Sequence, residues 1–75
     1  MTNKELFMTT VREKGIKLQF LADKIGISRQ ALSNKINNHS QFNAREVGEL
    51  KRLLALSQKE VDDIFFALDV DKITT

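Results

Sequence analysis

The stretch FLADKIGISRQALSNKIN, residues 20–37, predicts two short helices joined by a tight turn. Gly26 can end the first helix in the left-handed conformation, and Ser28 is a good N-cap for the second. Ala22, four residues before the glycine, lets the two helices approach each other closely. These features are what a helix-turn-helix requires, and we place this unit at about residues 18–37.

The second of these helices has a polar side opposite its apolar stripe. At about 100° per residue, Leu32 and Ile36 point in nearly the same direction and predict the buried side. Short polar side chains fill the opposite side and its flanks, with two cations beside the stripe: Gln30, Ser33, Asn34 and Asn37, then Arg29 and Lys35. Gln and Asn can read adenine, Arg can read guanine, and Ser can bond to any base. A solvated helix without a partner has the same chemistry, but the preceding turn favours a recognition helix.

Cap signals predict three further helices, and the fold class is therefore all-α. The first helix ends near Gly15, and the second begins around Lys17, which is a poor cap. Met1 and Leu6 have the spacing of a hydrophobic staple on the first helix. The predicted N-caps with their capping-box partners are Thr2 with Glu5, Asn43 with Glu46, and Ser57 with Glu60. We expect one compact five-helix domain over residues 1–75, with 69–75 either a frayed tail or a short extended segment.

Composition excludes several classes of protein. A chain of 75 residues is too small to enclose a deep catalytic pocket. It has no cysteine and a single histidine, His39, so it can form neither a disulfide framework nor a zinc site, and we expect no metal and no cofactor. No nucleophile has a defined place beside His39, so we expect no catalytic residue and no enzyme activity. Without an apolar run for a signal peptide or a membrane span, a cytoplasmic location is expected.

Charge is unevenly distributed along the chain. The whole sequence has a net charge of +2. Residues 9–45 contain seven basic and two acidic side chains, a net charge of +5, whereas residues 53–75 contain two basic and five acidic ones, a net charge of −3. Such a chain would orient its basic part toward a polyanion.

The run in residues 20–37 resembles the lambda-repressor-like helix-turn-helix family of phage repressors and Cro proteins, also called XRE-like. Its pattern is Leu-Ala-x-x-Leu/Ile-Gly-Val/Ile-Ser-x-x-x-Ile/Leu-Ser. Farther along, FNAREVGELKRLLALSQKEVDDIFF, residues 42–66, is similar to the fourth and fifth helices of small repressors from phages and mobile elements of Gram-positive bacteria. The resemblance implies a lambda-repressor-like domain and covers nearly the whole chain.

The resemblance also implies two groups of DNA-contacting residues. The base-reading positions are Ser28, Arg29, Gln30, Ser33 and Asn34. The phosphate-contacting positions are Lys17, Gln19, Asn38, His39, Ser40, Asn43 and Arg45, to which we add Lys35. This chain has Leu18 where the family often has a backbone-contacting Gln, so the contact is expected to move to Lys17 or Gln19. It also has Lys35 where the family favours an apolar residue.

The function implied is sequence-specific DNA binding by a transcriptional regulator of the Cro or repressor type. The protein would bind operator DNA in the major groove as a homodimer on two half-sites, in a bacterial cell or a phage-infected host. Phe66 turns away from the predicted core, and we expect it to form a dimer interface with Leu68 and Val70. An alternative with the same fold is a protein-interaction module that binds an antirepressor or a toxin partner.

Overall fold

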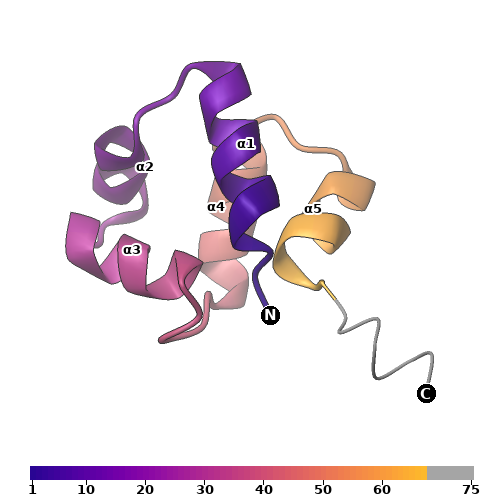
Figure 1. The fold of residues 1–75 in the computed structure, drawn as a ribbon. Coiled ribbons are helices and arrows are strands. Elements are labelled where there is room, and N and C mark those ends of the chain that lie inside the picture. The colour runs from indigo at the N-terminus through magenta and orange to yellow at the C-terminus, as the bar shows by residue number, and fades with distance from the viewer. Residues whose placement is uncertain (68–75) are drawn as a thin grey trace.

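The computed structural model describes residues 1–67 as five α-helices, and there is no strand in this part of the chain (Figure 1). The helices are α1 (Lys4–Lys14), α2 (Leu18–Ile25), α3 (Arg29–Ile36), α4 (Ala44–Leu53) and α5 (Gln58–Phe65). The all-α prediction with five helices is therefore confirmed. The expectations for the segment 69–75, and for Leu68 and Val70, fall outside the described residues.

Most predicted helix ends are found where the sequence placed them. Gly15 and Gly26 end α1 and α2 with φ of 68° and 82°, in the left-handed region that glycine adopts without a Cβ clash. Ser28 caps α3, and the capping boxes at Asn43 and Ser57 are both formed. Each of these caps satisfies an amide that the first turn of a helix would otherwise leave unpaired.

The start of α1 differs from the prediction. Its N-cap is Asn3, whose Oδ1 accepts a 3.1 Å hydrogen bond from the backbone N–H of Leu6. The predicted cap at Thr2, its capping box with Glu5 and the staple from Met1 are therefore wrong by one residue. Thr2 is instead buried, because Asn38 hydrogen-bonds to both its N–H and its carbonyl oxygen at 2.9 Å.

The helices surround one apolar core. In Figure 1, α1 lies in the middle of the view in front of α4, with α2 and α3 on one side and α5 on the other. Phe7 packs against Phe42 and Phe65 with ring centroids 6.1 and 5.9 Å apart, which joins α1 to the loop before α4 and to α5. Leu21, Ala22, Leu32, Leu50 and Ile64 are all buried in this core, as predicted for Leu32. Since fully burying one such aliphatic side chain contributes about 1.5–3 kcal/mol, this core is the main support of the helix arrangement.

Two non-glycine residues have the left-handed backbone conformation. Asn38, in the loop after α3, has φ of 65°, and Ala55, after α4, has φ of 52°. Asparagine adopts this region more readily than most residues, and the Asn38 amide is held here by two hydrogen bonds to the backbone of the distant Thr2. Ala55 lies where a helix commonly has glycine, since the N–H of the following Leu56 returns to the carbonyl of Lys51 at 2.9 Å. The Cβ of Ala55 therefore puts strain on the end of α4.

Candidate nucleic-acid interface

The turn between α2 and α3 is closed by backbone hydrogen bonds. The N–H groups of Gly26 and Ile27 both donate to the carbonyl of Ala22, at 2.9 and 3.0 Å. The Ser28 hydroxyl then accepts from the N–H of Ala31 at 3.0 Å, so that α3 begins at Arg29 with only Ile27 and Ser28 between it and the glycine. Ala22 is fully buried, so a larger side chain at this position would push the two helices apart.

The outer face of α3 is polar, and its side chains are paired along the helix. The Gln30 amide nitrogen donates to Asn34 Oδ1 at 3.1 Å, and the Asn37 amide nitrogen donates to Ser33 Oγ at 3.4 Å. Arg29 and Gln30 are exposed, while Ser33 and Asn34 are half-buried. Leu32 and Ile36 are buried on the opposite side, as predicted. The structure therefore brings all five predicted base-reading residues, from Ser28 to Asn34, onto α3 and its N-cap.

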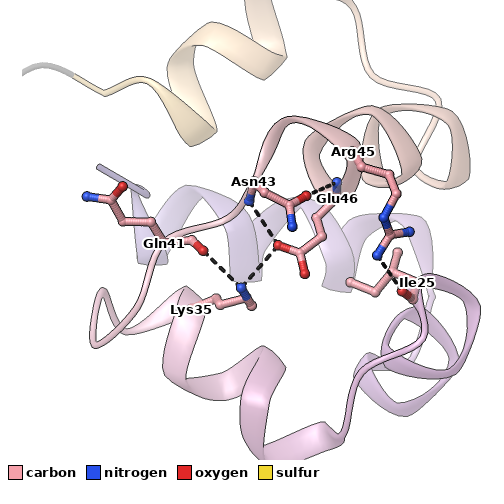
Figure 2. A network of polar contacts seen from close by, with 6 residues as sticks. All are labelled: Ile25, Lys35, Gln41, Asn43, Arg45 and Glu46. Atoms are coloured by element: carbon pink, nitrogen blue, oxygen red, sulfur yellow. Dashed lines mark hydrogen bonds and ion pairs between the residues drawn. The ribbon is translucent and has the colours of Figure 1, made fainter.

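Lys35 does not lie on this outer face. Figure 2 shows its ammonium turned toward α4, where it lies 3.1 Å from Glu46 Oε1 and donates to the Gln41 carbonyl at 2.9 Å. Its side chain is only 16% exposed. The ammonium also lies 5.9 Å from the centroid of the Phe42 ring. Lys35 thus fills a largely buried position, and any phosphate would have to compete with Glu46 for its charge.

Glu46 has two functions in this network. Its carboxylate accepts a hydrogen bond from the Asn43 N–H at 2.9 Å, which completes the capping box of α4, and it also pairs with Lys35 (Figure 2). Burial by itself raises the pKa of this carboxyl group, but the Asn43 N–H and the positive charge of Lys35 outweigh it, so the pKa of Glu46 is lowered overall. The ionised pair therefore couples the end of α3 to the start of α4.

The predicted phosphate contacts at the start of α2 and α4 are differently engaged. Lys17 is exposed and makes no side-chain cap, while the Gln19 amide donates to Asp23 at 2.8 Å. Arg45 is exposed, yet one of its guanidinium nitrogens donates to the carbonyl of Ile25 at 3.2 Å (Figure 2). Because a guanidinium has five N–H donors, Arg45 can hold the end of α2 and still present N–H groups to an anion.

The loop after α3 is folded back on the helix. The N–H groups of His39 and Ser40 both point to the Asn34 carbonyl, at 2.8 and 3.4 Å, and both residues are exposed. Asn38 was predicted to contact phosphate, but its amide binds the backbone of Thr2. The sequence does contain a signal that Asn38 follows the helix in the left-handed conformation. Asparagine is the second most common residue at this position of a helix end, and glycine is the most common.

Phe66 is 56% exposed at the end of α5. Of the three residues predicted to form a dimer interface, it is the one that the structure describes.

In residues 1–67 no helix is long and apolar enough to cross a membrane. The same residues contain no group of three or more His, Asp or Glu side chains that could hold a metal ion.

Comparisons with protein-family models, with curated proteins and with solved structures found no match to this chain.

Proposed function

We propose that this protein is a sequence-specific DNA-binding transcriptional regulator with a lambda-repressor-like arrangement, in which α2 and α3 form the helix-turn-helix. In this proposal α3 enters the major groove and Gln30, Asn34 and Arg29 contact base edges. The observation that carries it is the outer face of α3. Its polar side chains are accessible, while Leu32 and Ile36 anchor the helix to the core.

The hydrogen bond between Gln30 and Asn34 supports a role for Gln30 in recognising DNA bases. A side chain that contacts a base must lose its rotational freedom, which costs binding free energy when the side chain is mobile beforehand. The 3.1 Å bond holds the Gln30 amide in place before any partner arrives. Each good bidentate contact to a base then contributes about 1–3 kcal/mol of discrimination.

The charge distribution supports an electrostatic contribution to affinity. The net charge of +5 in residues 9–45 covers α2 and α3, and exposed Lys17 and Arg45 lie at the starts of α2 and α4. Neutralising phosphates releases counterions from DNA, so the affinity would fall steeply with salt. We further propose that two copies bind two half-sites in the cytoplasm of a bacterial cell or infected host, because one module this small contacts few base pairs.

Selection from a random DNA library, followed by gel-shift titration of the selected sequence, tests the proposal. We expect Gln30→Ala to lose preference for the selected sequence over random DNA while it keeps nonspecific binding. Thr9→Ala is the control, because Thr9 is exposed on α1, outside the proposed helix-turn-helix. If Gln30→Ala keeps the wild-type preference, α3 is not the reading element.

A second candidate function is a protein-interaction module that binds an antirepressor or a toxin. The observation that favours it is the exposed Phe66 beside the acidic residues of α5. A protein of this class would select no DNA sequence, so the same library would return random DNA.

A further inference from the structure

Two aromatic side chains are exposed on opposite sides of the molecule. Phe20 on α2 is 46% exposed and Phe66 at the end of α5 is 56% exposed. Figure 1 shows α2 and α5 on opposite sides of α1 and α4.

The surface around Phe20 is basic and hollowed. The ammonium of Lys24 lies 5.5 Å from the centroid of the Phe20 ring, one helical turn along α2. Beside the ring is a hollow of about 310 Å³ that is lined by Gly15, Ile16, Lys17 and Phe20 itself. This α2 patch, defined by Phe20 and Lys24, therefore offers an apolar recess and a positive charge.

An acidic side chain, Asp62, has the same four-residue spacing from Phe66 as Lys24 has from Phe20. Phe66 is the C-cap of α5, and its N–H donates to the carbonyl of Asp62, four residues earlier, at 3.1 Å, so both residues lie on one face of the last turn. The Asp62 carboxylate accepts a 2.9 Å bond from Gln58, which orients it. Neither Asp62 nor Lys24 takes part in an ion pair within residues 1–67. This α5 patch, defined by Asp62 and Phe66, therefore has a charge available for a partner.

The two patches are complementary when their helices run antiparallel. In each patch the aromatic ring and the charge are one helical turn apart, about 6 Å along the axis. The order along the chain is ring then cation on α2, but anion then ring on α5. An antiparallel contact thus places Phe66 against the recess at Phe20 and Asp62 against Lys24 at the same time.

We propose that the α2 patch of one copy binds the α5 patch of a second copy, head to tail. Such a contact is heterologous, so the dimer keeps one unused α2 patch and one unused α5 patch, and a third copy can add. On DNA, copies joined in this way would face the same direction along the duplex and would favour half-sites in direct repeat. The contact itself requires no DNA, so its test is independent of the proposed function.

Cysteine cross-linking of the full chain tests the contact, because the natural sequence has no cysteine. We expect a mixture of Lys24→Cys and Asp62→Cys proteins to form a disulfide heterodimer under mild oxidation, whereas each variant alone stays mostly uncross-linked. Glu13→Cys, exposed on α1, replaces Lys24→Cys in the control mixture, which should give little heterodimer. A homodimer of Asp62→Cys forming as readily as the mixed species would overturn the head-to-tail arrangement in favour of a symmetric α5 contact.

Charge reversal gives an independent measurement by sedimentation over a range of protein concentrations. We expect wild type to associate beyond the dimer, and Lys24→Asp or Asp62→Lys alone to weaken association by about tenfold or more. A mixture of the two single variants should regain association beyond the dimer, because both contacts between unlike copies pair opposite charges, one native and one reversed, whereas each variant alone pairs like charges. Wild type that remains monomeric throughout, or a mixture that associates no better than either variant, would refute the proposal.

Discussion

The ammonium of Lys35 in α3 lies 3.1 Å from the carboxylate of Glu46 in α4, and this contact places a cation at a largely buried position of α3. The pair is shielded from water, with the two side chains only 16% and 4% exposed. Burial makes each charge depend on the other, because an unpaired ion there loses its hydration without compensation.

Replacing Lys35 by methionine should therefore destabilise the protein although it adds apolar surface. We expect the free energy of unfolding to fall by about 2–3 kcal/mol, because Glu46 keeps its buried charge without a cation. Urea unfolding at neutral pH measures this change. Lys59→Met removes the exposed partner of Asp63 and should leave the urea midpoint nearly unchanged. Equal effects of the two substitutions would mean that the Lys35 pair is no more important than a surface pair.

The lowered pKa of Glu46 makes stability depend on pH in a defined direction. Folding favours the ionised form of this carboxyl group, whose ordinary pKa is 4.5. Its contribution to stability is therefore complete well above pH 4.5 and is lost as the pH falls through the lower folded pKa. We expect Glu46→Gln to be less stable than wild type at pH 7 and to lose less stability on acidification. Unfolding curves of the two proteins between pH 7 and acid pH test this, and parallel pH dependences would contradict it.

Ala55 offers a route to a more stable protein. An alanine with φ of 52° destabilises the folded state by about 1–2 kcal/mol. Glycine removes this strain, but it also increases the conformational entropy of the unfolded chain, so only part of the free energy is recovered. We expect Ala55→Gly to raise the free energy of unfolding by about 0.5–1 kcal/mol. The control is Ala31→Gly within α3, which should lower it by about 1 kcal/mol. Destabilisation by both would show that Ala55 is not strained.

Salt dependence distinguishes phosphate contacts from base contacts. If Lys17 contacts phosphate, Lys17→Ala should make the slope of log affinity against log salt shallower by about 0.9 for each phosphate that the variant no longer neutralises. Gln30→Ala should leave this slope unchanged and reduce only the preference for the selected sequence. Gel-shift titrations at several salt concentrations measure both quantities. An unchanged slope in Lys17→Ala would remove this residue from the proposed phosphate contacts.

Local signals in the sequence were sufficient for most helix ends. The hydrogen bonds that end or cap these helices join residues only a few positions apart, so nearby residues in the sequence are enough to predict them. The residues concerned are Gly15, Gly26, Ser28, Asn43 and Ser57. The exception was α1, where Thr2 and Asn3 are both good caps. Contact with Asn38, 36 residues away, holds Thr2 outside the helix.

The buried and exposed faces of α3 could also be predicted from the sequence, whereas the contacts between its side chains could not. Helical periodicity alone placed Leu32 and Ile36 inside and Gln30 outside, because one face of a short helix must pack on the core. Periodicity could not show that Gln30 and Asn34 bond to each other, since two amides four residues apart can adopt several rotamers.

The sequence by itself therefore determined the five helices, most of their caps and the polar outer face of α3, because these depend on interactions across one or two turns. Only the tertiary structure decided where long side chains direct their charge. Lys35 turns to Glu46 and Arg45 turns to the carbonyl of Ile25, 20 residues before it. Such partners come from other elements and are brought close only when the core assembles, so no spacing along the chain predicts them.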